Sequence, residues 1–170
     1  MSKIILASKS KVREEILKNN GIECEVIPSN IDENPIKQSL EKEGATPELI
    51  SKNLAELKAN KVSTLKPGNI VIGADSVIDF ENEIISKPRT RTEAMSILVK
   101  LNGKSHKLIS SVCISKNGSM IWNYTDRASL KMKQFTYTQL ENYLSKISDK
   151  NLYSLRTDNI LLKRSANQSK

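Results

Sequence analysis

The 170-residue sequence is poor in the features that build membrane spans, disulfide frameworks and cysteine-rich metal sites. It has two cysteines, Cys24 and Cys113, which lie far apart and outside any C-x-x-C pattern. The apolar run near its N-terminus, Ile4–Ala7, is much too short for a signal peptide or a membrane span. We therefore expect a cytoplasmic protein with two buried, reduced thiols and no membrane partner.

Nucleophilic catalysis also finds little support in the composition. His106 is the only histidine, and no serine or cysteine lies in a G-x-S-x-G nucleophile elbow. A histidine-based triad is thus not indicated, and we interpret His106 as a structural residue near the start of a strand. The polar groups that are left are carboxylates and cations, which is the set used for metal-assisted attack of water on a phosphate ester.

Aromatic residues make up only 4% of the sequence and are not interleaved with basic residues, which disfavours a stacking platform for single-stranded nucleic acid. The 27 Lys and Arg outnumber the 19 Asp and Glu, and the net charge of +8 favours a polyanionic partner. Nucleic acid, an anionic membrane and a phosphorylated small molecule all fit this charge. A basic nucleic-acid-binding module is a minor alternative, and it predicts an affinity that falls steeply with salt.

Strand and helix patterns alternate along the chain and predict an α/β fold, in which a mixed twisted sheet is flanked by helices. A hairpin is predicted at Asn117-Gly118. The predicted strands are 3–8, 23–29, a run from residue 70, 84–86, 106–115 and 119–133. The predicted helices begin at Ser8 or Ser10, at Thr46 with a stripe of Ile50, Leu54, Leu57 and Val62, at a Thr90–Glu93 capping box, and at a Thr138–Glu141 capping box.

Asp75 is the most informative polar residue. It follows the apolar run Ile70–Ile72 through Gly73 and Ala74, so it is predicted at the end of a buried strand. A carboxylate there is costly unless it is paired, binds a metal or faces a cleft, and the two small residues before it allow a ligand or another backbone to approach. A functional role is therefore the favoured interpretation of Asp75.

Other charged residues have two interpretations each. The segment Ser8–Arg13 could bind an anion at a helix start or form a plain helix cap with a basic turn. Asp32 and Glu33, expected in a loop after a strand, could bind a metal or simply be solvated. Lys58 on a helix and Lys87 before a proline would not be singled out alone, because such lysines usually face solvent.

Together these segments resemble the Maf family of nucleoside triphosphate pyrophosphatases. The segment Ser8–Arg13 is similar to the family's Ser-x-Ser-Pro-Arg-Arg turn, and Gly73–Ser76 to its Gly-Ala-Asp-Thr signature. Four further matches are Asp32-Glu33, Lys58-Ala59, Ser86-Lys87-Pro88 and Asn102-Gly103 followed by His106. Val12 departs from the pattern, because it replaces an arginine that would bind phosphate with two hydrogen bonds, and Lys11 replaces that contact only in part.

The resemblance implies a Maf or inosine-triphosphatase-like fold with an active-site cleft between two lobes. It implies hydrolysis of a nucleoside triphosphate to the monophosphate and diphosphate with Mg²⁺ or Mn²⁺, as housecleaning of nucleotide pools. Asp75 would be the catalytic carboxylate, as general base or as metal ligand, and Glu33 the second carboxylate at the metal. The residues that would bind substrate are Ser8, Arg13, Lys58 and Lys87.

The resemblance extends from residue 3 to about residue 150. After Tyr153 the sequence lacks the family's Gly-x-Tyr-x-Ile-Gln-Gly strand. We therefore expect a pyrophosphatase domain over 1–153 that is incomplete at its C-terminal end, and a divergent basic tail over 154–170 with a weak strand through 160–162. The alternative function is a catalytically impaired remnant that binds nucleotides. A homodimer is possible by family resemblance, and the preferred base is not predicted.

Overall fold

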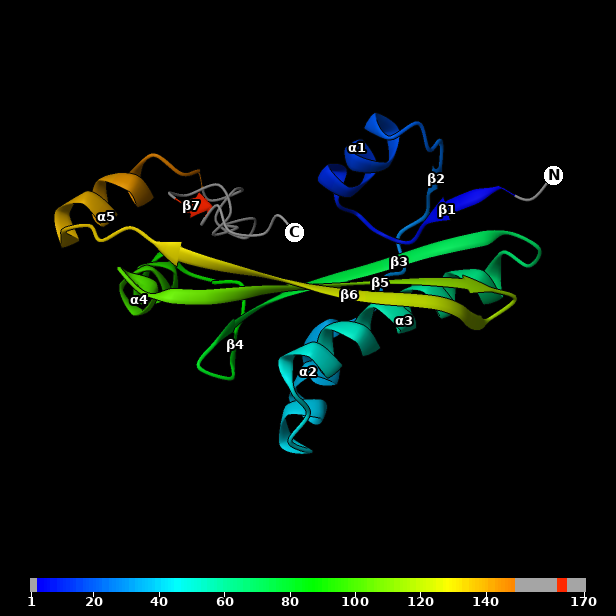
Figure 1. The fold of residues 1–170 in the computed structure, drawn as a ribbon, viewed down its shortest axis with the longest axis horizontal. Coiled ribbons are helices and arrows are strands. Elements are labelled where there is room, and N and C mark those ends of the chain that lie inside the picture. The colour runs from blue at the N-terminus through cyan, green and yellow to red at the C-terminus, as the bar shows by residue number, and fades with distance from the viewer. Residues whose placement is uncertain (1–2, 149–161, 165–170) are drawn as a thin grey trace, which may run out of the picture. The chain divides into compact units, whose positions relative to one another are not determined.

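The computed structural model describes residues 3–148 and 162–164, which form a mixed α/β fold (Figure 1). The strand order is β2-β1-β3-β5-β6-β7, and β4 pairs with β3. The elements are β1 (Ile4–Leu6), α1 (Lys11–Asn19), β2 (Glu25–Val26), α2 (Glu33–Lys42), α3 (Pro47–Leu65), β3 (Ile70–Phe80), β4 (Glu83–Ile85), α4 (Arg91–Leu101), β5 (Ser105–Lys116), β6 (Ser119–Met132), α5 (Tyr137–Ser145) and β7 (Leu162–Arg164).

The sheet combines both strand directions. β1 pairs in parallel with β2 and with β3, whereas β3 pairs antiparallel with β4, and β6 with β7. The turn between β5 and β6 has left-handed φ angles at both central residues, 52° at Asn117 and 82° at Gly118, as a tight hairpin of this type requires. The predicted mixed sheet with helices and the predicted hairpin are confirmed.

The chain divides into two compact units, 1–76 with 109–126, and 77–108 with 127–170. In the first unit, Ile5, Ala7, Val62 and Val71 form one buried cluster between β1, β3 and α3. A second cluster joins Ala55 and Ala59 of α3 to Cys113 of β5. Figure 1 shows α3 beside the strands of this unit.

The second unit has its own core, in which α4 and α5 pack on β3, β4 and β6. Its buried members are Phe80, Ala94, Leu98, Leu101, Met132, Leu140 and Leu144. Arg91 ties the two helices together, because its guanidinium donates to the carbonyl oxygens of Leu144 and Ile147, at 2.7 Å each. The expected helix that ends before Asn102-Gly103 is therefore confirmed as α4.

Several local predictions were wrong or only partly right. The capping box of α5 is Thr136–Gln139, two residues before the predicted pair. At α4, Thr90 is the N-cap as predicted, and its hydroxyl accepts from the backbone N–H of Glu93. The Glu93 carboxylate accepts from the backbone N–H of Arg89 and not from that of Thr90, so the second hydrogen bond of the predicted capping box is absent. Leu57, predicted on the buried stripe of α3, is 42% exposed. Cys24 is only half-buried, whereas Cys113 is buried as expected.

The tail prediction lies largely outside the described residues. Residues 154–161 and 165–170 lie outside the described residues, and so does the predicted domain boundary at residue 153. The described strand β7 spans Leu162–Arg164 and pairs with Leu130–Met132 of β6, so a strand does occur here, beginning at the last residue of the predicted one. Of the helices in the described ranges, none is both long enough and apolar enough to cross a bilayer.

Gly73 sets how closely α3 approaches β3. A Cβ atom at this position would lie 2.3 Å from the carbonyl oxygen of Ala55 and 2.8 Å from the Cβ of Ala59. The first of these neighbours is helix backbone, which cannot rotate away as a flexible side chain would. Only glycine therefore allows this contact, and the close approach brings the side chains of α3 within reach of β3.

We expect Gly73→Ala to lower the free energy of unfolding by about 1–3 kcal/mol, because the added methyl group forces α3 away from the strand. Urea denaturation followed by circular dichroism measures this change. Ser76→Ala, on the same strand with an exposed side chain, is the control and should cost less than about 1 kcal/mol. Equal stability of Gly73→Ala and the wild type would mean that the helix–strand contact is looser than described.

The two thiols should differ in reactivity. Burial raises the pKa of the Cys113 thiol to about 11, and its side chain is fully buried beside Met120. Burial raises the pKa of Cys24 as well, with the nearby Glu14 as a smaller cause, but this side chain is half-exposed. At pH 8 we expect a disulfide reagent to label one thiol per folded chain, and Cys24→Ser to abolish that labelling. Two rapidly reacting thiols in the folded protein would contradict the burial of Cys113.

Candidate active site

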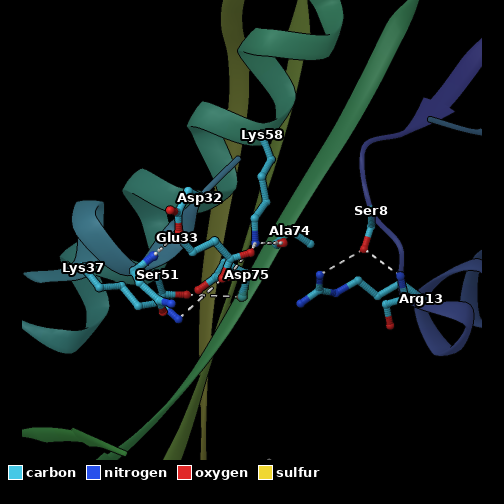
Figure 2. A network of polar contacts seen from close by, with 11 residues as sticks. Ser8, Arg13, Asp32, Glu33, Lys37, Ser51, Lys58, Ala74 and Asp75 are labelled. Atoms are coloured by element: carbon cyan, nitrogen blue, oxygen red, sulfur yellow. Dashed lines mark hydrogen bonds and ion pairs between the residues drawn. The ribbon is translucent and has the colours of Figure 1, made fainter. Parts of the chain in front are cut away.

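A buried lysine lies at the centre of the polar network in the first unit (Figure 2). Lys58 extends from α3, its residue is 6% exposed, and its Nζ lies 2.7 Å from Asp75 Oδ1 and 2.7 Å from Glu33 Oε1. The same Nζ lies 3.5 Å from the carbonyl oxygen of Ala74. A lysine that sequence patterns would assign to solvent is thus the cation that joins two carboxylates from different elements.

Asp75 lies within β3 and not at the end of the strand, which corrects the prediction from sequence. The strand continues to Phe80, and Asp75 is 4% exposed. Because side chains alternate along a strand, Gly73 and Asp75 face α3 together. The bare backbone at Gly73 lets the helix come close, and two residues later the carboxylate meets Lys58.

The two carboxylate oxygens of Asp75 have different surroundings. Oδ1 accepts from Lys58, whereas Oδ2 is buried and has no hydrogen-bond partner within the described residues. The hydroxyl of Ser51, itself fully buried on α3, donates to the main-chain oxygen of Asp75 at 3.2 Å and holds this stretch of the strand. A buried carboxylate oxygen without a partner is costly, so a water, a cation or a substrate group is expected to satisfy it.

Glu33 is the first residue of α2, not part of a loop as predicted. Asp32 is the N-cap, and its side chain accepts from the backbone N–H of Asn34. Pro35 is tolerated because the first turn of a helix does not need its N–H groups for helical hydrogen bonds. The helix start directs Glu33 toward Lys58, while Lys37, one turn further on, lies 3.5 Å from Glu33 Oε2 (Figure 2).

Ser8 and Arg13 form a second polar pair in the same unit. Ser8 follows β1 and is 7% exposed, and its Oγ accepts from the backbone N–H of Ser10 and from the Arg13 guanidinium, both at 3.2 Å. The Ser10 side chain makes no capping hydrogen bond to α1. Figure 2 shows the Arg13 side chain reaching from α1 toward β3, on the side of Ala74 and Asp75. The pair presents a cation at a helix start.

Lys87 and His106 belong to the second unit. Lys87 is exposed in the segment between β4 and α4. His106 is the second residue of β5, as expected near a strand start, and it is 4% exposed. Burial lowers the pKa of its imidazole, so the ring is neutral at pH 7. The structure therefore brings Glu33, Lys58 and Asp75 into contact within one unit and pairs Ser8 with Arg13 there, whereas Lys87 lies in the other unit.

Whether the site suits a divalent cation depends on its donor atoms. In the described ranges, no group of three or more His, Cys, Asp or Glu residues could hold a metal. Mg²⁺ usually binds through one or two carboxylates, completed by water and substrate phosphates. Asp75, with its unpartnered Oδ2, and Glu33 supply such a pair of carboxylates. The residues present thus fit a cation that substrate helps to hold, and not a site built from protein alone.

Two residues of this network were missed from the sequence. Lys37 follows Glu33 at helical i, i+4 spacing, a pattern that would have been informative had α2 been predicted. Ser51 lies on the same face of α3 as Lys58, two helical turns earlier. Once Lys58 is placed at the site, this spacing indicates that Ser51 faces β3 as well.

Comparison with known proteins finds relatives that match most of this chain. A protein of Pelagibacter ubique called nucleoside triphosphate pyrophosphatase is 64% identical over 154 residues, which cover 91% of this chain and 79% of that protein. The protein of the same name from Caulobacter vibrioides is 37% identical, covering 91% and 77% of the two chains. A 7-methyl-GTP pyrophosphatase of Brucella abortus is 37% identical, covering 86% and 74%.

Among solved structures, a HAM1 protein from Coxiella burnetii is similar with a TM-score of 0.45 and 14% sequence identity, covering 76% of this chain and 71% of that one. The sequence profile described as Maf-like protein matches residues 3–152, which include every residue of the network around Lys58. With this match over most of its length, and relatives that are 64% and 37% identical, the chain belongs to the Maf family.

Proposed function

We propose that this protein hydrolyses nucleoside triphosphates to the nucleoside monophosphate and diphosphate. The observation that carries the proposal is the buried Asp75 carboxylate, which has Lys58 on one oxygen and no partner in the described residues on the other. The relatives named nucleoside triphosphate pyrophosphatase and 7-methyl-GTP pyrophosphatase support the same activity. The reaction belongs to the housecleaning of nucleotide pools in the cytoplasm.

The cations would bind the triphosphate and stabilise the negative charge that develops on the leaving diphosphate. Arg13 is the best placed of them, because its guanidinium already donates to Ser8 beside the start of α1. Lys58 offsets part of the repulsion between Asp75 and Glu33, because its single positive charge contacts both carboxylates. Lys87 we propose as a further phosphate-binding residue on the strength of the Ser86-Lys87-Pro88 motif.

Two roles fit the free oxygen of Asp75. Oδ2 can accept a proton from the attacking water, or it can be a ligand of a divalent cation together with Glu33. A bound Mg²⁺ or Mn²⁺ would supply charge neutralisation and polarisation of the phosphate oxygens. Measuring Mn²⁺ binding to Asp75→Asn in the absence of nucleotide separates the two roles, because only a ligand role predicts a loss of binding.

The test of the proposal is diphosphate release from a panel of nucleoside triphosphates, including 7-methyl-GTP, with Mg²⁺, with Mn²⁺ and with a chelator. We expect release that requires the divalent cation and differs in rate among the bases. Absence of release by a folded protein with every nucleotide would contradict the proposal. If nucleotides still bind in that case, the impaired nucleotide-binding remnant becomes the better description of the chain.

A further inference from the structure

The ion pairs at the active site form a chain of alternating charge. It runs from Asp75 through Lys58 and Glu33 to Lys37, with N···O distances of 2.7, 2.7 and 3.5 Å in that order. The first two pairs share one lysine and use Asp75 Oδ1 and Glu33 Oε1. The third is the longest of these ion pairs and uses the other oxygen of Glu33, Oε2.

The ion-pair contacts of Lys58 are to Asp75 Oδ1 and Glu33 Oε1. A divalent cation held by the carboxylates of Asp75 and Glu33 would meet the positive charges of Lys58 and Lys37 there. Lys37 is the more readily displaced of the two, because its contact is longer and its side chain is 20% exposed against 7% for Lys58. Lys37 thus occupies a position where its positive charge and the cation compete for the same oxygen.

We infer that Lys37 competes with the divalent cation for Glu33 Oε2 and so sets how tightly the active site binds that cation. The inference rests on the proposed function, because it takes Glu33 and Asp75 as the carboxylates at the metal. In this role Lys37 is a positioning residue that acts through Glu33. Its effect is to weaken, without abolishing, binding of the cation in the absence of nucleotide, and substrate phosphates then complete the coordination of the cation.

The experiment measures Mn²⁺ binding to the full chain without nucleotide, by calorimetry and by electron paramagnetic resonance of the free ion. Lys37→Gln removes the competing charge and should tighten binding about 3- to 10-fold. Lys42→Gln is the matched control, because it removes the same charge from the exposed last turn of the same helix. We expect the control to change binding by less than about 2-fold.

A double-mutant cycle separates local competition from a general charge effect. In a Glu33→Gln background, Lys37→Gln should change Mn²⁺ binding no more than Lys42→Gln does, because the shared oxygen no longer carries charge. Unchanged or weaker binding in Lys37→Gln, an equal effect of Lys37→Gln in both backgrounds, or no Mn²⁺ binding by the wild type would each overturn the inference.

Failure of the inference and failure of the proposed function are distinguishable. Binding is measured without nucleotide, whereas the function is measured as diphosphate release. A chain that shows the expected Mn²⁺ behaviour and releases no diphosphate would refute the function and leave the role of Lys37 intact. Diphosphate release with identical Mn²⁺ binding in Lys37→Gln and the wild type would refute the role of Lys37 alone.

Discussion

Asp75→Asn is expected to lower the rate of diphosphate release by about 10²–10⁴-fold while the fold is retained. Asparagine has nearly the shape of aspartate and its amide oxygen can still accept from Lys58, which lies 2.7 Å from Oδ1. The change removes the negative charge of the buried carboxylate and places an amide nitrogen on one side of it. The group can then neither take a proton from water nor bind a cation well. Steady-state kinetics with saturating Mn²⁺ and nucleotide measure the effect.

Asp79→Asn is the control for this substitution. Asp79 is a second buried acid on β3, 7% exposed, and its Oδ1 accepts from the backbone N–H of Asn82. An asparagine can keep that hydrogen bond, so we expect activity within a few-fold of the wild type. An active Asp75→Asn would remove Asp75 from the mechanism. Equal losses in both variants would indicate damage to β3 and not loss of a catalytic group.

The second large effect is expected for Lys58→Met, which should lower the free energy of unfolding by about 3 kcal/mol. The substitution keeps the length of the aliphatic stem but removes the cation between two carboxylates, and Asp75 is then left buried without its partner. The side chain of Glu33 is 34% exposed, so solvent screens its share of the loss. This screening is why the value lies at the low end for a broken buried ion pair. Urea denaturation at pH 7 measures it.

Two further variants test this explanation. Lys61→Met is a lysine substitution one turn further along α3, where the side chain is exposed and donates to the carbonyl oxygen of Asn30, and it should change stability by less than about 1 kcal/mol. Combining Lys58→Met with Asp75→Asn should recover most of the lost stability, because the charge left unpaired by the first substitution is removed by the second. If the double variant is as unstable as the sum of the singles, the loss comes from packing and not from charge.

The unusual surroundings of Asp75 were predictable from its local sequence, whereas Lys58 and Lys87 were singled out only through the family resemblance. Glycine and alanine before an acid after an apolar run indicated that Asp75 has unusual surroundings. The cause of these surroundings is long-range packing, which local sequence patterns do not predict, because Gly73 lies against the backbone of Ala55. Asp75 itself lies within a strand that continues past it to Phe80. A run of residues interrupted by glycine and aspartate was therefore mistaken for a strand end.

The burial of Lys58 was not predictable from its own helix. Lysine on a helix is usually exposed, and the stripe of Ile50, Leu54 and Val62 says only which face is apolar. The buried position of Lys58 depends on two carboxylates from α2 and β3 that lie next to it in the fold. The helix α2 itself was missed, because its short apolar face is weak and Pro35 in the first turn resembles a loop signal.

Identification of the products of the wild-type reaction tests the central claim most directly. Phosphorus NMR of a nucleoside triphosphate incubated with the protein and Mg²⁺ distinguishes cleavage between the α and β phosphates from cleavage between the β and γ phosphates. The account predicts nucleoside monophosphate and diphosphate as the only products, lost together in Asp75→Asn. Nucleoside diphosphate and orthophosphate, or no product from a folded chain that binds the nucleotide, would contradict it.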